Sequence, residues 1–450
     1  MTHRLFAFVI AGCLASTSAW AQADLVATPP ANLVISNYNS TAVGPNGGLE
    51  GYAFAARVDD PSAAWFNPAG LARQASAQIS GSAGVYQRTQ VSPRLLPDRG
   101  GSIQQLPNFV GFTVTPREGL TAGAALLSTN AWSQATDSEL FVPVASGQQR
   151  FAYSAESDFE QRVAAIGVGF HGKGPWRVGA GFAFSLMSLR LVQSASNRVA
   201  DPVDLRSLLV SAHASGSALQ LRTQGGAQYD TGNWRLGGVF RSPGVTLHKS
   251  GSVVLDGVFA GQPESSGASI FDPEARLVYH LPWEFQAGAA YVRPRLELEF
   301  DVLGYTPIDA YQLLSSDQPV RFYTDAGSAP PAMATRPFGG LTVASKGLAN
   351  VSVGGHVRPF SQRDLRIHAG VSTNGSPVAP EDTVFTRVDL TTWSVGASGT
   401  LKRFQFAVGF NRQTGKAEDV RLQNLVTNQE LRSQVDVHIL GFIYSLGYQF

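Results

Sequence analysis

Apolar and polar residues alternate along most of this sequence, and this alternation limits the possible folds more than any other feature. Between Arg293 and Leu303, one set of alternate positions is apolar: Leu296, Leu298, Phe300 and Val302. The other set is charged: Arg295, Glu297, Glu299 and Asp301. Successive side chains of a β-strand point to opposite faces, so this spacing predicts strands. It recurs around residues 233–241, 350–357, 364–371 and 403–411. The fold is expected to be all-β.

Two architectures make such strands. In a soluble sandwich the apolar face is the core, whereas in a transmembrane barrel it contacts lipid and the polar face lines the lumen. Only 15% of the residues are charged, against about 25% in a soluble domain. Beyond Ala23 no run of 18 or more apolar residues occurs, which excludes a membrane-spanning helix. Composition therefore favours the barrel.

Strand number and connections agree with a barrel. We expect about fourteen strands, near residues 78–89, 108–116, 119–129, 159–170, 176–193, 217–229, 233–242, 245–256, 275–292, 295–305, 349–358, 364–373, 390–400, 403–412 and 434–450. Tight turns are expected at 173–175, 294 and 401–402, and long polar loops at 130–157, 194–216, 257–274, 306–348 and 413–433. Short turns at one rim and long loops at the other are typical of outer-membrane barrels. The prediction is a transmembrane antiparallel β-barrel over residues 76–450.

The last strand ends at the chain terminus with an aromatic face. Its alternate residues are Leu440, Phe442, Tyr444, Leu446, Tyr448 and Phe450. A strand of this kind with a terminal Phe resembles the assembly signal of bacterial outer-membrane barrels, carried here by Tyr444, Leu446, Tyr448 and Phe450. The resemblance implies two partners, the barrel assembly machinery and outer-membrane lipid.

The first 23 residues read as an export signal. A basic start at residues 1–4 and an apolar run at 5–15 precede Ala21-Gln22-Ala23, which fits a cleavage site before Asp24. An alternative is lipoprotein processing at Cys13, although only about six apolar residues precede it, fewer than such signals contain. Cleavage at Asp24 leaves a mature chain without cysteine, and hence without disulfides or thiolate metal sites.

Residues 24–75 are not strand-like. They hold Pro29-Pro30, Gly44-Pro45, Asp60-Pro61 and Asn67-Pro68, too many breakers for a spanning strand. They also hold large apolar residues that favour burial, namely Leu25, Leu33, Ile35, Phe54, Trp65 and Phe66. A plug inside the barrel lumen accounts for both properties, and a periplasmic linker is the alternative.

The segment from Gly51 to Ala72 resembles the hatch of the FadL/TodX family of outer-membrane long-chain fatty-acid and hydrocarbon transporters. Its Asn67-Pro68-Ala69 matches that family's Asn-Pro-Ala motif. Weaker matches follow in family order at 235–243, 281–301 and 370–396. The resemblance implies a fourteen-stranded barrel closed by an amino-terminal hatch. It also implies passive import without a cofactor: capture of an apolar molecule at the outer face, transfer to a hatch pocket, and lateral release beside a kinked strand.

Candidate ligand-binding residues follow from this comparison. Residues 202–213 read as a short helix with Leu205, Leu208 and Leu209 on one side, where the family has its capture groove; an ordinary loop helix is the alternative. Phe54, Trp65 and Phe66 are candidates for the hatch side of the pocket, or else they only pack the plug. Arg190, at the end of a strand, is a candidate partner for a carboxylate. Glu297, Glu299 and Asp301 are expected to face the lumen as partners for arginines.

Other functions find little support. The Gly167–Gly172 stretch fits G-x-G-x-x-G, but Gly174-Pro175 and another strand follow, so a hairpin turn is expected instead of a phosphate site. The eight histidines show no metal-ligand spacing, there is no G-x-S-x-G motif, and a net charge of +1 argues against nucleic acid. We therefore expect no enzyme and no metal. A secretion shuttle of the same superfamily is the first alternative, and an outer-membrane lipid hydrolase the second.

Overall fold

The computed structural model describes residues 34–41, 43–74, 76–93, 100–144, 147–200, 206–260, 265–325, 332–360, 364–382, 384–423 and 430–450. The predicted signal peptide with Cys13, the first ten residues of the predicted hatch (24–33) and Leu205 lie outside these described residues.

Two short helical turns precede the strands: α2 (Ala63–Phe66) and the 3₁₀ turn η2 (Pro68–Arg73). The next six strands are β1 (Gln78–Pro93), β2 (Gly100–Arg117), β3 (Leu120–Val144), β4 (Gly147–His171), β5 (Trp176–Ala200) and β6 (Arg206–Asp230). Shorter strands follow: β7 (Trp234–Arg241), β8 (Val245–Ala260), β9 (Ser265–Asp272), β10 (Arg276–Leu277), β11 (Glu284–Arg293), β12 (Leu296–Tyr305), β13 (Ile308–Ser315), β14 (Pro319–Asp325), β15 (Ala332–Pro337), β16 (Leu341–Ser345) and β17 (Leu348–Val357). The last are β18 (Leu365–Asn374), β19 (Asp389–Leu401), β20 (Phe404–Gln423) and β21 (Glu430–Gln449).

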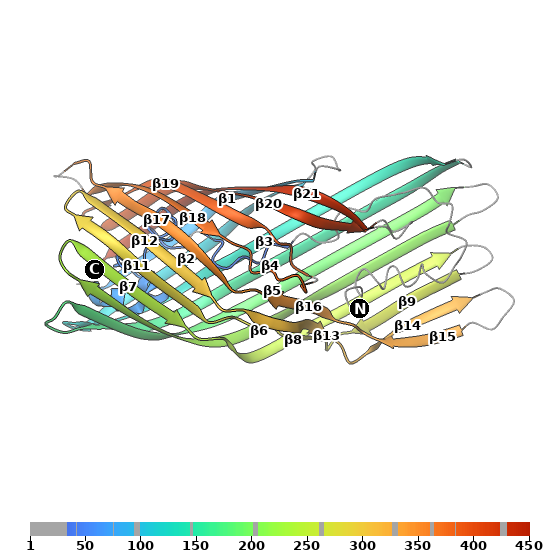
Figure 1. Cartoon of the computed structure of the whole chain (residues 1–450), viewed down its shortest axis with the longest axis horizontal. Coiled ribbons are helices and arrows are strands. Elements are labelled where there is room, and N and C mark those ends of the chain that lie inside the picture. Colours follow the sequence, from blue (N-terminus) through green and yellow to red (C-terminus); the bar gives the residue numbers. More distant parts are fainter. Residues whose placement is uncertain are drawn as a thin grey trace.

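These strands close into a barrel (Figure 1). Antiparallel pairing runs β1–β2–β3–β4–β5–β6–β7–β11–β12–β17–β18–β19–β20–β21, and β21 returns to β1, where Gln449 faces Gln78. Closure pairs both edges of the sheet, which a lipid environment requires. The expected antiparallel barrel of about fourteen strands is confirmed.

Four of the fourteen strands are interrupted. β7 and β8 both pair with β6 and are separated only by residues 242–244. The next three are assembled from β9 to β11, β12 to β14 and β15 to β17; their middle parts β10, β13 and β16 leave the main sheet and form a small sheet of their own. Leu277 of β10 packs against the inner face of β6 at Gly216. At the level of Gly216, the middle parts of these interrupted strands therefore lie inside the barrel rather than in its wall.

The connections differ in length at the two rims, but the predicted long loops are largely strand. β3 and β4 join at residues 145–146, and β5 and β6 at 201–205, so the stretches expected to be loops at 130–157 and 194–216 extend the hairpins. Strand also fills most of 257–274, 306–348 and 413–433. The long-hairpin end lies at the right of Figure 1. Many outward residues at this end are polar. The alternation of apolar and polar residues, which depends on a lipid-facing side, therefore did not predict these parts of the strands.

The outward face near the short turns is apolar. On β5 it runs from Trp176 through Phe182 to Leu186, each 42% exposed or more. Neighbouring strands continue the band, with Phe112, Val168, Phe170, Trp234, Phe240, Phe285, Phe300, Trp393, Phe406, Phe410 and Leu446. Exposed apolar surface on this scale is a lipid contact. Among the described residues, no helix is long and apolar enough to cross a membrane.

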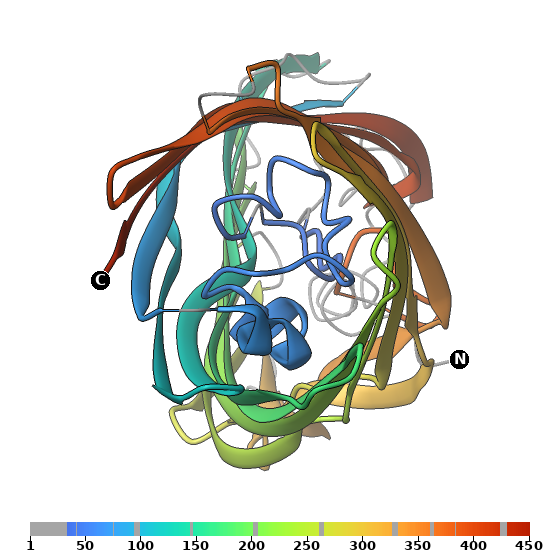
Figure 2. The ribbon, with the colours of Figure 1, turned by 90° about the vertical axis from the view of Figure 1, so that its left-hand side faces the viewer.

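The hatch lies inside the barrel (Figure 2), where its described part, residues 34–41 and 43–74, fills the lumen near the short turns. Phe54, Trp65, Phe66 and Leu71 of the hatch pack with Phe109 and Val163 of the wall in one apolar cluster. The carboxylates of Glu297, Glu299 and Asp301 on β12 also hold it, as expected from their alternation. The described part of the amino-terminal segment thus lies inside the barrel, against the inner side of the wall.

The apolar band predicts where charge destabilises the barrel. Phe182→Lys places an ammonium group in the middle of the band, and we expect a loss of about 2–4 kcal/mol in unfolding free energy. Ser194→Lys, outward on the same strand but nearer the long-hairpin end, should cost less than about 1 kcal/mol. Urea titrations in lipid vesicles measure both, and equal losses would contradict the placement of the band.

Candidate functional site between the hatch and the barrel wall

Towards the long-hairpin end, the inside of the barrel above the hatch is apolar. A continuous buried cluster draws on the wall and on the loop after β18: Trp132, Phe159, Met187, Leu189, Leu208, Val210, Leu255, Ile270, Leu277, Leu281, Leu314, Val384, Phe385, Val437 and Ile439. Val34 and Ile35 of the hatch join it. Porin lumens are polar because they hold water, so this interior is built for apolar contacts.

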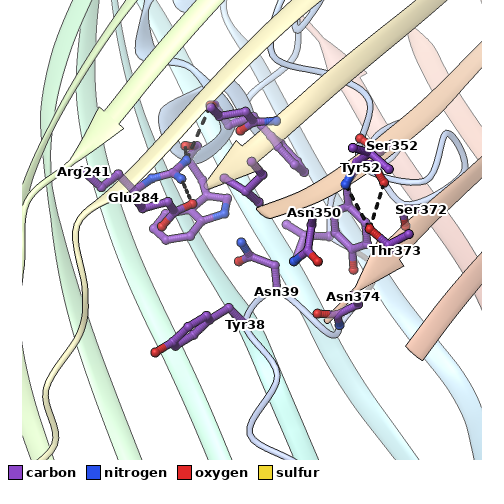
Figure 3. Close-up of a pocket in the computed structure, with 16 residues that line it drawn as sticks. Tyr38, Asn39, Tyr52, Arg241, Glu284, Asn350, Ser352, Ser372, Thr373 and Asn374 are labelled. Atoms are coloured by element: carbon purple, nitrogen blue, oxygen red, sulfur yellow. Dashed lines mark hydrogen bonds and ion pairs between the residues drawn. The ribbon is translucent and has the colours of Figure 1, made fainter. Parts of the chain in front are cut away.

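A pocket lies between the hatch and the barrel wall (Figure 3). Hatch residues Tyr38, Asn39, Val43, Tyr52, Trp65 and Phe66 form one side. Wall residues Arg241, Glu284, Gln286, Leu303, Asn350, Val351, Ser352, Ser372, Thr373 and Asn374 form the other. Its volume is ≈ 40 Å³, well below the cavity of about 150 Å³ that holds benzene in another protein. A ligand can enter only if hatch side chains move.

The arginines beside the pocket outnumber their carboxylates. Arg241 is 1% exposed and pairs with Glu284, while its other nitrogens donate to Gln224 Oε1 and to the Trp65 carbonyl. Its guanidinium also lies 4.0 Å from the Trp65 ring. Arg222, likewise buried, donates to the carbonyls of Ser242 and Pro282 and reaches the same Glu284 at 3.5 Å. One positive charge is left without a matching anion in this group.

The Asn-Pro-Ala motif fixes the hatch to the wall by close backbone contact. The Asn67 amide donates to the Ala55 carbonyl at 2.8 Å and to Ala227 of β6 at 3.3 Å, and it accepts from the Ala69 N–H at 3.1 Å. A Cβ on Gly179 of β5 would lie 2.3 Å from the Pro68 carbonyl carbon. The motif therefore requires glycine in the wall opposite.

Two hatch groups have shifted pKa values. Burial raises the pKa of Asp60 to about 7, although hydrogen bonds from Ser62 lower it in part. Burial would likewise raise the pKa of Glu50, but Arg57, His356 and His368 outweigh it and hold that pKa well below its usual range. Glu50 is thus anionic inside the barrel, whereas Asp60 gains or loses its proton near neutrality.

The predicted hatch residues lie at or near the pocket. Trp65 and Phe66 line it. Phe54 lies behind them, with its ring 5.9 Å from that of Phe66, in the cluster that packs the hatch. Ligand contact by these three side chains stays a prediction.

The predicted capture helix is wrong. Residues 206–213 belong to strand β6, which pairs with β5 and β8. Leu208 points inward into the apolar cluster, and Leu209 points outward with 59% exposure. The spacing of leucines at 205, 208 and 209 matched a helix, but Leu208, Val210 and Ala212 also alternate with a period of two. Leu205 lies outside the described residues.

Arg190 also differs from expectation. It lies within β5 rather than at its end, on the outward face, and pairs with Glu156 at 3.0 Å and Asp158 at 3.9 Å. Odd-numbered neighbours such as Leu189 fill the interior, so period two directs Arg190 away from the pocket. It forms a charged cluster above the apolar band.

Sequence analysis missed most of the pocket's polar lining. Tyr38 and Asn39 lie in a hatch stretch without a motif, and Arg241 and Glu284 come from strands far apart in sequence. One signal was available: Arg241 falls within a segment that matches the family, at the end of an alternating strand. Its pairing with Glu284 follows only from β7 lying beside β11.

Comparison with solved structures finds the same architecture over nearly the whole chain. A FadL homologue of Pseudomonas aeruginosa matches with a TM-score of 0.57 and 14% identity, over 92% of this chain and 100% of that one. The chain shares the FadL fold. The Ralstonia pickettii toluene transporter TbuX (TM-score 0.54, 14% identity, 91% and 98% covered) and the P. putida toluene transporter TodX (0.56, 14%, 91% and 99%) are also similar. No family model and no curated protein matches the sequence.

The contact at Gly179 predicts a selective effect of one methyl group. Gly179→Ala should push the Asn-Pro-Ala segment from the wall and make the hatch accessible to protease. Gly238→Ala is the matched control, because a Cβ on Gly238 meets nothing within 4 Å. Limited proteolysis of folded barrels, followed by mass spectrometry of hatch peptides, compares the two. Equal cleavage would contradict the close contact.

Asp60 predicts a pH dependence of stability. Its folded pKa of about 7 exceeds the ordinary value of 3.8, so the folded state binds the proton more tightly. Stability should therefore fall as pH rises from about 4 to about 7, by about 4 kcal/mol at most. Asp60→Asn should remove this slope and leave the variant more stable than wild type at pH 8. Urea titrations at pH 5 and pH 8 measure the unfolding free energy of both proteins. The same change between the two pH values in wild type and variant would contradict the assignment.

Proposed function

We propose that this protein is a passive outer-membrane importer of long-chain fatty acids or similar hydrophobic compounds. The observation that carries the proposal is the apolar interior of the barrel together with a small pocket between hatch and wall. Each methylene group that leaves water gains about 0.8 kcal/mol, so such a lumen attracts an apolar chain and excludes hydrated solutes. The fold shared with FadL and toluene transporters supports the same conclusion.

The proposed route begins at the long-hairpin end. A ligand enters between the extended hairpins β3 to β6 and follows the apolar cluster inward. It then displaces side chains such as Tyr52 and Trp65 to enlarge the hatch pocket. Movement of the hatch is needed because the pocket is otherwise too small. No cofactor takes part in this route.

A fatty acid rather than a neutral hydrocarbon is favoured by the charge beside the pocket. Arg222 and Arg241 share the single carboxylate of Glu284, so a ligand carboxylate would balance the remaining charge. Charge-assisted bonds of this kind are about twice as strong as neutral ones. A toluene-like ligand would leave the charge unbalanced.

Lateral release is proposed beside β3. Pairing between β2 and β3 ends at Phe109 and Leu127, and a β-bulge follows at residues 128–130. The hatch contacts this bulge directly: the Thr41 N–H donates to the Thr129 carbonyl, and the Asn130 amide donates to the Asn37 carbonyl. Movement of the hatch would therefore free the unpaired edge of β3.

Uptake of labelled oleate by cells that lack their own importer tests the proposal. Wild type should give saturable uptake, and a variant without residues 24–50 should give none although it folds in the outer membrane. Arg222→Gln should reduce oleate uptake by about tenfold, the effect of about 1.4 kcal/mol, and change toluene uptake little.

Each alternative has its own outcome. Saturable toluene uptake without oleate uptake would replace fatty acid by hydrocarbon. If a folded barrel took up neither compound, the import proposal would be wrong. In that case co-purification of a stable protein partner would indicate a secretion shuttle, and lipid hydrolysis an enzyme.

A further inference from the structure

Two histidines and a glutamate meet at the junction of hatch and wall, away from the pocket. His356 of β17 and His368 of β18 face each other across the two strands. Both direct Nδ1 at the same atom, Glu50 Oε1 of the hatch, at 2.9 Å and 2.7 Å. The three ligand atoms lie within 4.8 Å of one another, and the three residues are buried.

The backbone around the cluster is built for this approach. A Cβ on Gly354 of β17 would lie 1.9 Å from the Glu50 carbonyl oxygen, and one on Gly370 of β18 would lie 2.2 Å from the Glu50 carbonyl carbon. Glycine at both positions lets the hatch turn lie directly on the two strands. The Glu50 carboxylate therefore reaches the space between the two imidazoles.

The outer neighbours of His368 and Glu50 resemble those of metal ligands. In metal-bound histidines, the nitrogen that does not bind the metal usually donates to an oxygen. His368 Nε2 lies 2.7 Å from Ser398 Oγ, within hydrogen-bond distance. His356 Nε2 lies 3.9 Å from the Glu297 carboxylate, too far for a hydrogen bond. Arg57 holds the second oxygen of Glu50. Without a metal, both Nδ1 atoms need protons to share one oxygen.

The charges around the cluster sum to a net negative charge. The cluster and its neighbours include three carboxylates that form ion pairs, those of Glu50, Glu297 and Glu299. Among the described residues, the arginines that pair with these carboxylates are Arg57 and Arg358. Buried anions need matched cations, so the remaining negative charge favours a bound cation.

We propose that Glu50, His356 and His368 bind a divalent transition-metal ion that fixes the hatch to the barrel wall. Two imidazoles and one carboxylate favour Zn²⁺, with bonds of about 2.0–2.2 Å and a fourth position for water. The ion joins one hatch residue to two strands, so its loss loosens the hatch without breaking the barrel. The ligands lie far apart in the sequence, at positions 50, 356 and 368, so a spacing motif could not reveal them.

The metal content of the folded barrel tests the proposal. Protein is purified from outer membranes of cells grown with zinc, dialysed against metal-free buffer and measured by mass spectrometry of the element. We expect about one zinc per chain in wild type and at least a tenfold loss in the His356→Gln, His368→Gln double variant. His248→Gln, which changes an exposed histidine on β8, should keep the wild-type content.

A second measurement uses wild type alone, so it does not depend on how the variants fold. The chain is unfolded with a chelator, refolded without metal and titrated with Co²⁺. Visible absorption bands that saturate at one equivalent and vanish on addition of Zn²⁺ support the site. Chelator should also increase protease cleavage of the hatch in wild type.

Two results would overturn the proposal. One is wild-type zinc content no higher than that of the folded double variant. The other is the absence of cobalt bands in refolded wild type. Neither readout involves uptake, so the metal site and the transport function stand or fall separately.

Discussion

The docking of the hatch depends on a buried arginine in the lumen. Arg57 is 2% exposed and donates to Glu299 at 2.7 Å, pairs with Glu50, and lies 3.7 Å from Glu297. Its Nη2 also donates to the Ala53 carbonyl, a hydrogen bond within the hatch that stabilises the turn around Ala53. Removal of one partner from a buried pair costs about 3–5 kcal/mol. This cluster therefore fixes the orientation of the hatch, which apolar packing alone leaves free to slide.

The barrel divides its interior between two kinds of contact. Around the hatch, inward positions carry charges and amides that bind hatch backbone, as Asp301 does for the N–H groups of Phe54 and Ala55. Towards the long-hairpin end, inward positions are apolar and continuous. The pocket lies between hatch and wall, with Trp65 and Phe66 on one side and Asn350 and Asn374 on the other. An apolar molecule drawn in from outside would stop where the polar hatch begins.

Much of the barrel could be predicted from alternation, because a strand faces lipid on one side and the lumen on the other. On β12 the inward set Glu297, Glu299 and Asp301 was correct. Alternation failed where its physical cause was absent. Beyond the apolar band, outward residues contact water and are no longer apolar. The alternation therefore disappears from the sequence there, although β5 and β6 continue as strands through the residues predicted to form a loop. In this region the spacing of leucines at 205, 208 and 209 wrongly predicted a helix. Arg190 was predicted to contact a ligand, but its side chain points away from the lumen.

The sequence by itself determined the period of the strands, their approximate number and the breaker-rich character of the hatch segment, because each depends on neighbours in the chain. The tertiary structure alone decided which strands face one another. It brings Arg222 and Arg241 to one Glu284, and it places His356 opposite His368 with Glu50 between them. Such groups depend on strand register and on the depth of the hatch, which are set by closure of the whole barrel and not by any local run of residues.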